Sequence, residues 1–289
     1  MNGARGFAPL SKARRSTIAD LTTRAGRERR GLYLLEGPRA IEDALARGAK
    51  LTWLVADGAG EREVERWLAA GLVPEATALY RAAEGELARL ADTATPQGVL
   101  AVGELPAEGL GALPGVGASR VADEPGAVAQ REVVLLVDGV QDPGNLGTLL
   151  RTLAAVGGAA AICCKGTVDP FNPKALRGSA GATLWLAVAR GVERRAAADW
   201  CAERGVAIVA LAAGGVDLFG GRSPVGPLPA GPLALAVGGE AAGLSPEILA
   251  AAAVVAGIPM DPGVESLSAA VAGSIALYAL AHDLVHGGR

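Results

Sequence analysis

Short, almost wholly apolar runs alternate with helical stretches through the second half of the chain, and this alternation constrains the fold most strongly. Strands that are apolar at nearly every position are typical of a parallel sheet covered by helices on both faces. A long final helix is expected from about Ser266 to His286. The sequence therefore predicts an α/β domain that binds any ligand at the carboxyl ends of its strands. The apolar runs, between residues 133 and 260, are VVLLVDG, AAAICC, ATLWLAV, VAIVALA, PLALAVGG and VVAGIPM.

Residues 31–103 show a similar alternation on a smaller scale. GLYLLEG, LTWLVAD and GVLAVGE are expected to be strands, whereas PRAIEDALARG, EREVERWLAAG and GELARLAD have helical spacing. The periodicity is then lost in a segment that collects Gly, Pro and Ala, which indicates a flexible linker. We therefore expect a small α/β domain in residues 1–103, a linker in 104–131 and a second domain in 132–289.

Composition is that of a globular protein with a substantial core, since 51% of the 289 residues are hydrophobic and 20% are charged. Gly and Pro interrupt the apolar runs well before the roughly 20 residues that a membrane helix needs, so no membrane span is expected. Cys163, Cys164 and Cys201 lack C-x-x-C spacing, and we expect neither a disulfide framework nor a metal site. The amino terminus has no apolar core of the signal-peptide type, which favours a cytoplasmic protein.

Residues 1–30 are strongly basic, although the net charge of the whole chain is −3. Taken alone, such a segment is what a solvated, partly disordered terminus looks like. An excess of cations is also what a contact with nucleic acid requires. The acidic residues of the segment are Asp20 and Glu28, and its basic residues are Arg5, Lys12, Arg14, Arg15, Arg24, Arg27, Arg29 and Arg30.

The loop after VVLLVDG contains Asn145, which we expect to cap the following helix, and Arg151 lies inside that helix. A planar guanidinium with several donors suits the recognition of phosphate or carboxylate. From this loop alone, a simple cap and a surface arginine explain the residues equally well.

Two further loops follow predicted strands. Gly238, Glu240 and Gly243 have the spacing G-x-E-x-x-G, which is neither a dinucleotide fingerprint nor a P-loop, so a nicotinamide or nucleoside triphosphate site is not supported. In the last loop, I-P-M precedes a helix that we expect Ser266 to cap, with Ser268 in its first turn. Amides and hydroxyls at such a helix start can bind a polar ligand group.

In this order and spacing, the three loops strongly resemble the motifs of the SpoU (TrmH-type) RNA 2′-O-ribose methyltransferases, members of the SPOUT class. The motifs here read N-x-G-x-x-x-R, then G-x-E-x-x-G-L-S, then I-P-M followed by S-L-S. NPKALRGSAGAT resembles a further segment of that family, and LLEGPRAIEDAL and LADTATPQGVLAV resemble its substrate-binding amino-terminal domain. The resemblance covers nearly the whole chain apart from the linker.

The resemblance implies a carboxyl-terminal parallel-sheet SPOUT domain tied into a deep trefoil knot, and a smaller amino-terminal α/β domain that is ribosomal-protein-like and binds RNA. It also implies S-adenosylmethionine as cofactor, a homodimer, and large-subunit ribosomal RNA as substrate, with transfer RNA as the alternative. The cofactor contacts that it implies are Gly238, Glu240, Gly243, Ile258, Met260 and Leu267.

Carried over in the same way, the catalytic candidates are Arg151, Asn145, Ser266 and Ser268. Arg151 resembles an arginine proposed to assist deprotonation of the ribose hydroxyl, Asn145 is expected to orient Arg151 or the RNA, and Ser266 to contact cofactor or ribose. Most relatives have asparagine where this chain has Ser268. That exchange leaves open a non-catalytic RNA-binding or assembly protein that retains the fold.

Overall fold

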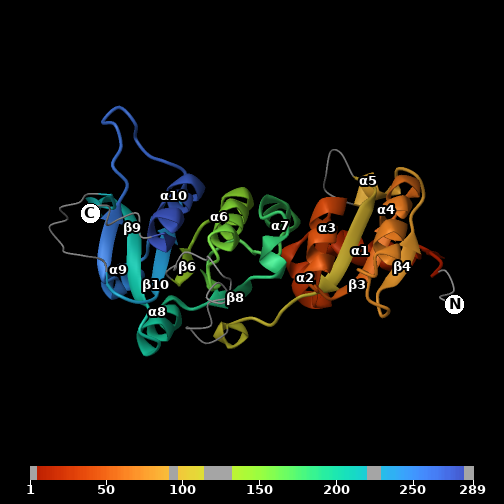
Figure 1. Cartoon of the computed structure of the whole chain (residues 1–289), viewed down its shortest axis with the longest axis horizontal. Coiled ribbons are helices and arrows are strands. Elements are labelled where there is room, and N and C mark those ends of the chain that lie inside the picture. Colours follow the sequence, from red (N-terminus) through yellow and green to blue (C-terminus); the bar gives the residue numbers. More distant parts are fainter. Residues whose placement is uncertain (1–4, 91–96, 114–131, 220–228, 283–289) are drawn as a thin grey trace. The chain divides into compact units, whose positions relative to one another are not determined.

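The computed structural model describes residues 5–90, 97–113, 132–219 and 229–282, and the chain divides into two compact units. Unit 1 consists of Met1–Pro106 and Phe171–Trp185, and unit 2 consists of Ala107–Pro170 and Leu186–Arg289. Figure 1 colours the chain from red to blue along the sequence. Each unit has its own sheet and its own buried core.

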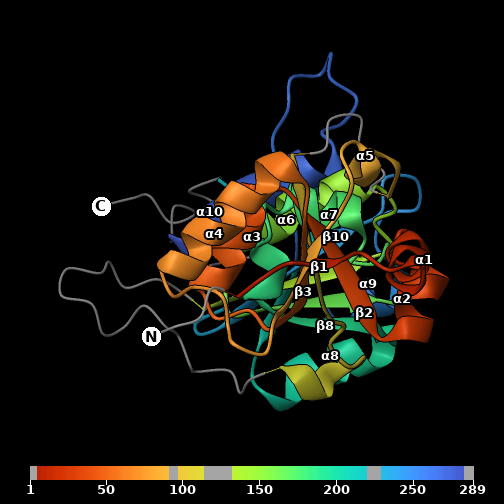
Figure 2. The same cartoon turned by 90° about the vertical axis from the view of Figure 1, so that its right-hand side faces the viewer.

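Unit 1 is built on a five-stranded mixed sheet in the order β1-β4-β3-β5-β2. Strand β5 pairs antiparallel with β2 and β3, whereas the pairs β3–β4 and β4–β1 are parallel. Figure 2, in which this unit faces the viewer, shows α3 and α4 on one side of the sheet and α1 and α2 on the other. The bounds are β1 (Ala8–Pro9), α1 (Lys12–Leu21), α2 (Arg24–Arg30), β2 (Leu32–Glu36), α3 (Pro38–Ala46), β3 (Leu51–Ala56), α4 (Gly58–Ala69), β4 (Ala78–Arg81), α5 (Glu86–Leu90), β5 (Val99–Glu104), α7 (Pro173–Gly178) and the 3-10 helix η2 (Ala182–Leu184).

The basic segment is folded over residues 5–30. Helices α1 and α2 begin after Ser11 and Thr23, whose hydroxyl oxygens each accept a hydrogen bond from a backbone N–H of the first turn. Arg27 is only 1% exposed and donates from Nη1 to the carbonyl of Leu21 at 2.9 Å. Burial of Ile18 and Leu21 fixes the helices, so the interpretation as a partly disordered terminus is wrong for these residues.

Residues 171–185 group with unit 1, although they fall within the range expected for the second domain. Phe171 and Leu176 join a buried cluster of unit 1, and Arg177 Nη1 donates to Glu36 Oε2 at 2.8 Å. Packing against β2 and α3 side chains therefore decides where the segment belongs. Local periodicity does not report such tertiary packing.

The prediction of a strand at ATLWLAV is wrong for the first half of that run. Gly181 has a φ of +80°, and Ala182–Leu184 form a 3-10 turn. Thr183 Oγ1 donates to Ser179 Oγ at 2.9 Å within this turn, and the strand begins only at Ala187. A short apolar run can be buried as a strand or as a helical turn, and its pattern does not separate the two.

Unit 2 is built on a six-stranded sheet in the order β11-β9-β10-β6-β7-β8, and every pair of neighbouring strands is parallel. The predicted parallel α/β architecture is confirmed. The bounds are η1 (Leu110–Ala112), β6 (Val133–Asp138), α6 (Pro143–Ala155), β7 (Ala160–Cys164), β8 (Ala187–Val192), α8 (Arg194–Glu203), β9 (Ala207–Asp217), β10 (Leu233–Gly238), α9 (Pro246–Ala251), β11 (Val254–Gly257) and α10 (Ala269–Ala281).

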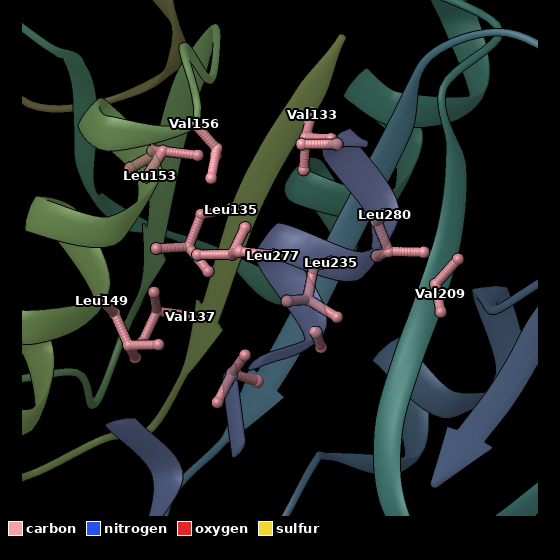
Figure 3. Close-up of a cluster of buried hydrophobic side chains, with 14 of the residues drawn as sticks. Val133, Leu135, Val137, Leu149, Leu153, Val156, Val209, Leu235, Leu277 and Leu280 are labelled. Carbon is pink, nitrogen blue, oxygen red and sulfur yellow. The ribbon is translucent and has the colours of Figure 1, made fainter. Parts of the chain in front are cut away.

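Helices cover both faces of this sheet, as its apolar strands require. Leu149 of α6 and Leu277 of α10 pack in one cluster with Leu135 of β6 (Figure 3). The next residue of the strand, Leu136, points to the opposite face and packs in a cluster with Trp200 of α8. In the described ranges, no helix is both long and apolar enough to cross a membrane.

The first part of the expected linker is structured. Glu104 ends β5, and Leu110 and Leu113 pack against a core cluster of unit 2. Gly109 N donates to the carbonyl of Arg190 in β8 at 3.1 Å. Residues 114–131, the rest of the expected linker, lie outside the described ranges, as do residues 283–286 of the expected final helix.

Replacing Leu149 by alanine is expected to lower the free energy of unfolding by about 2–5 kcal/mol, because its buried side chain fills space between α6 and α10. A Cβ built on Gly273 of α10 would lie 2.4 Å from Leu149 Cδ2, which shows how closely the helices approach. Urea unfolding measures the loss. The adjacent exposed residue supplies the control, Thr148→Ala, which should change stability by less than about 0.5 kcal/mol. Equal losses from both variants would contradict this packing.

Candidate active site

The loops after β6 and β10 leave the sheet side by side. These strands are parallel neighbours, and their last residues, Asp138 and Gly238, are direct partners in the register. The loop after β6 leads into α6, and the loop after β10, residues 239–244, leads into α9. We call residues 239–244 the glycine loop. Two of the three motif loops are thus brought together at the carboxyl edge, where parallel sheets bind ligands.

Asn145 does not cap α6, contrary to the expectation. Asp142 is the N-cap, and its Oδ1 accepts a hydrogen bond from Asn145 N at 2.8 Å. An aspartate satisfies this position as well as an asparagine does. The Asn145 side chain is therefore available for another contact, and its Nδ2 donates to Glu240 Oε1 at 2.5 Å.

The glycine loop closes on itself and on β6. Gly239 N donates to the carbonyl of Asp138 at 3.0 Å, and Gly243 N donates to the carbonyl of Gly239 at 2.9 Å. A Cβ on Gly238 would lie 2.2 Å from the carbonyl carbon of Gly243, and Gly243 itself has a φ of +65°. These glycines are needed for the turn of the backbone, and the turn leaves Glu240 exposed.

Asp138 is a residue of this site that the sequence reasoning missed. Its side chain is 1% exposed, and its carboxylate accepts from Arg194 Nε at 2.7 Å and from Ser245 N at 2.8 Å. An aspartate that ends an otherwise apolar buried strand was the available signal, because a buried carboxylate requires partners.

Arg151 is exposed on α6. The other arginines of unit 2 that the structure describes are Arg190, Arg194, Arg195 and Arg204, and each forms an ion pair with a carboxylate. Within the described residues, Arg151 is the one arginine of this unit with no ion pair. Its guanidinium is available to an external anion.

The third motif loop is largely exposed. Ile258 packs at the edge of a core cluster, whereas Met260 is 38% exposed and Ser266 is exposed, with Leu267 half-buried. Figure 1 shows this segment as the blue loop that precedes α10. In the described part of the chain, no hydrogen bond joins it to Asn145 or Glu240.

Ser268, and not Ser266, caps the final helix. Ser268 Oγ accepts a hydrogen bond from Val271 N at 3.3 Å, and α10 begins at Ala269. The expected start near Ser266 is wrong because a turn at residues 261–264 comes first, closed by the bond from Val264 N to the carbonyl of Asp261 at 2.9 Å.

The cysteines are poor candidates for chemistry. All are buried and free, and burial raises the pKa of Cys164 and of Cys201 to about 12 and the pKa of Cys163 further still. They are neutral thiols at pH 7, whereas a nucleophile or metal ligand needs the thiolate. The residues in the described ranges contain no group of three or more His, Cys, Asp and Glu side chains that could hold a metal ion.

The residues at this edge fit S-adenosylmethionine, which carries hydroxyls, an amino group and an apolar ring face. The exposed Glu240 carboxylate and the backbone of the glycine loop can accept hydrogen bonds from hydroxyl and amino groups. Ile258, Met260 and Leu267 keep apolar surface accessible on the third loop. Ligand sites usually combine such apolar walls with a few polar groups.

Gly238→Ala is expected to destabilise unit 2 by about 1–3 kcal/mol, since the added methyl group meets backbone atoms of Gly243 and Leu244 that cannot move aside as a side chain does. Thermal and urea unfolding report the change. The control is Ala242→Ser, an exposed position in the same loop, which should leave stability unaltered. A Gly238→Ala protein as stable as the wild type would disprove the close approach of the loop ends.

This chain resembles known proteins both in sequence and in structure. Residues 132–278 match the model of the SpoU rRNA Methylase family, and residues 16–101 match the MRM3-like substrate binding domain. The chain is 31% identical over 280 residues to the 23S rRNA (guanosine(2553)-2′-O)-methyltransferase RlmP of Bacillus subtilis, covering 94% of this chain and 98% of that protein. It is 28% identical to the 23S rRNA (uridine(2479)-2′-O)-methyltransferase of Streptomyces viridochromogenes, covering 92% and 88%.

Solved structures agree with the sequence comparison. The SpoU methyltransferase AviRb from Streptomyces viridochromogenes, in complex with AdoMet, superposes with a TM-score of 0.78 at 27% identity, covering 96% of this chain and 100% of that chain. An RNA methyltransferase of the TrmH family from Porphyromonas gingivalis gives a TM-score of 0.76 at 28% identity, with 96% and 100% covered. With residues 132–278 matched to the family model and 94% of its length matched to RlmP, this chain belongs to the SpoU rRNA methylase family.

Proposed function

We propose that this protein is an S-adenosylmethionine-dependent RNA 2′-O-ribose methyltransferase that acts on large-subunit ribosomal RNA. The observation that carries the proposal is the hydrogen bond from Asn145 to Glu240, which joins two motif loops of the family at the carboxyl edge of the sheet. Relatives named as 23S rRNA methyltransferases match nearly the whole chain. Those two relatives are named for different nucleotides, guanosine and uridine.

The glycine loop and the third motif loop would hold the cofactor. Gly238 and Gly243 shape the backbone, Glu240 offers a carboxylate, and the apolar surface comes from Ile258, Met260 and Leu267. When bound, S-adenosylmethionine supplies a methyl group activated by its positive sulfonium. The protein is left with the tasks of orienting the ribose hydroxyl and stabilising its developing negative charge.

Arg151 suits the second task. An arginine stays protonated in proteins, so its role is to bind an RNA phosphate or the developing oxyanion as a fixed cation and not to act as a free base. The side-chain amide of Asn145 donates to Glu240. Its carbonyl oxygen therefore remains available to accept a hydrogen bond from the ribose. Arg151 and Asn145 are separated by about one and a half turns of α6.

Ser268 can take a structural role that an asparagine would also suit. Serine and asparagine are comparable helix caps, and Ser268 does cap α10. Its hydroxyl oxygen accepts from Val271 N, which leaves the O–H free to donate to cofactor or ribose. Ser266 lies exposed in the preceding loop, where it can contact the same ligands.

Unit 1 would supply RNA affinity, since it contains the segment that matches a substrate-binding domain. Lys12, Arg24, Arg29 and Arg30 are exposed on α1 and α2, so they can reach phosphates, whereas buried Arg27 cannot. Phosphate contacts of this kind provide affinity that does not depend on sequence. A cytoplasmic location is part of the proposal, and three free buried thiols are consistent with a reducing compartment.

The protein is proposed to be a homodimer, and α10 offers the surface. Val271, Ile275 and Tyr278 are 47%, 37% and 46% exposed, and their spacing puts them on one face of the helix. The opposite face, with Leu277 and Leu280, is buried in the core. A stripe of large apolar side chains exposed at helical spacing is typical of an interaction surface.

A trefoil knot is also proposed for unit 2. In support, β10 pairs with β6 and β9, the chain then passes to the far side of β9 to form β11, and it returns as α10 against α6 and β10. A crystal structure that traces residues 218–232 decides the question, because an unthreaded path there would refute the knot.

Wild-type protein is expected to transfer methyl groups from radiolabelled S-adenosylmethionine to ribosomal RNA that lacks the modification, at one 2′-hydroxyl of the large-subunit RNA. Mapping by alkaline cleavage locates the site. Label in transfer RNA alone would show that the substrate is transfer RNA and not ribosomal RNA. Cofactor and RNA binding without transfer to any RNA would favour a non-catalytic assembly protein.

Arg151→Ala should lower the transfer rate about 100-fold or more, since a charge that stabilises the transition state is removed. Affinity for S-adenosylmethionine should stay within about 2-fold of the wild type, because Arg151 lies on α6 and not on the cofactor loops. Arg195→Ala, an exposed arginine of α8, is the matched control and should retain activity. Equal losses of cofactor affinity and of rate would show that Arg151 is structural.

Ile275→Lys is expected to convert the dimer to the monomer mass of 28.9 kDa, because a charge placed in the buried centre of an interface is strongly unfavourable. Light scattering after size exclusion measures the mass. Leu249→Lys, a residue of α9 that is 38% exposed, is the control and should leave the dimer intact. A dimer that tolerates Ile275→Lys would place the interface elsewhere.

A further inference from the structure

Asp138 lies where three elements of unit 2 meet. It ends β6, its Oδ1 accepts from Arg194 Nε at the start of α8, and its Oδ2 accepts from Ser245 N at the start of α9. With 1% of the side chain exposed, the carboxylate is out of reach of bulk water. It is nevertheless well paired, since one oxygen faces a guanidinium and the other a backbone amide.

The same residue holds both ends of the glycine loop. At the first end, the Asp138 carbonyl accepts from Gly239 N at 3.0 Å, and at the second end its carboxylate accepts from Ser245 N at 2.8 Å. Between these points the bond from Gly243 N to the carbonyl of Gly239 closes the turn. The loop has little freedom left, and Glu240 at its tip meets Asn145.

Arg194 stabilises the buried carboxylate of Asp138. A buried carboxylate without a cation would carry a large desolvation cost. Charges facing the pair from neighbouring elements include Glu247 of α9, and the Cys164 thiol of β7 lies close to both partners. Burial raises the pKa of that thiol to about 12, so it stays neutral and adds no charge at pH 7.

We propose that Asp138 is a positioning residue for the cofactor: it fixes the glycine loop at both ends and so sets the position from which Glu240 binds S-adenosylmethionine. This inference rests on the proposed function of the site. Asp138 is buried beneath the loop and touches neither cofactor nor RNA in this scheme. It acts through the backbone amide of Ser245 and through Glu240.

Ser245→Pro tests the tether by deleting one donor. Proline has no N–H, and the φ of −68° at Ser245 matches the fixed φ of proline. Ser245→Ala keeps the N–H and is the comparison at the same position. We expect Ser245→Pro to weaken S-adenosylmethionine binding about tenfold more than Ser245→Ala does, as the loss of a hydrogen bond to a charged group predicts. Calorimetry of the full-length chain measures the affinities.

A second pair of measurements separates positioning from general destabilisation. In a Glu240→Gln background, Ser245→Pro should cost much less affinity than in the wild type, because residues that act as a unit are not additive. The transfer rate at saturating cofactor should fall by less than about 3-fold. Full additivity with Glu240→Gln, or equal affinities of the proline and alanine variants, would overturn the proposal.

Asp138→Asn gives an independent answer if the proline variant does not fold. Asparagine has one acceptor oxygen and can satisfy only one of the two donors. It should weaken cofactor binding at least tenfold while RNA binding by unit 1 stays unchanged. Asp199→Asn, which alters an exposed acid of α8, is the control. Wild-type protein that binds no S-adenosylmethionine would refute the proposed function itself, whereas normal cofactor affinity in Asp138→Asn would refute the tether alone.

Discussion

The parallel pairing of β6 with β10 is the constraint on which the site of unit 2 depends. Both strands are buried on two faces, so their register is fixed by the packing of every side chain, and Asp138 is held opposite Gly238. Because the strands run in the same direction, their loops must leave at the same edge. The meeting of Asn145 with Glu240, residues 95 positions apart, follows from that pairing and not from either loop alone.

Helix caps decide which polar groups remain free for chemistry. A first turn needs its N–H groups satisfied, and an oxygen used for that purpose has less capacity for a ligand. Asp142 takes this role at α6, which releases the amide of Asn145, and Ser268 takes it at α10. Serine and asparagine are comparable caps, so a helix start at position 268 can be formed by either residue.

Sequence patterns predicted the strands well because burial on both faces leaves an apolar run that few other structures produce. β6, β7 and β10 begin and end close to the expected positions. The pattern failed at Ala182–Leu184, where a turn bonded through Ser179 buries similar side chains, and it missed the short strand β4 between β1 and β3. The caps at Asp142 and Ser268 were also missed, since several polar residues near each helix start could serve and only the tertiary path selects one.

The arginines show why site residues are harder to identify than strands. In sequence, Arg151 and Arg194 look alike, since each belongs to a helix that follows a strand of the same sheet. Arg194 neutralises the buried carboxylate of Asp138, whereas Arg151 has no carboxylate partner among the described residues. A cation that the fold does not use can bind a ligand at little cost, because no internal pair must first be broken. Among the described arginines of this unit, Arg151 is therefore the candidate for binding a ligand, and only the three-dimensional pairing of the other arginines reveals this.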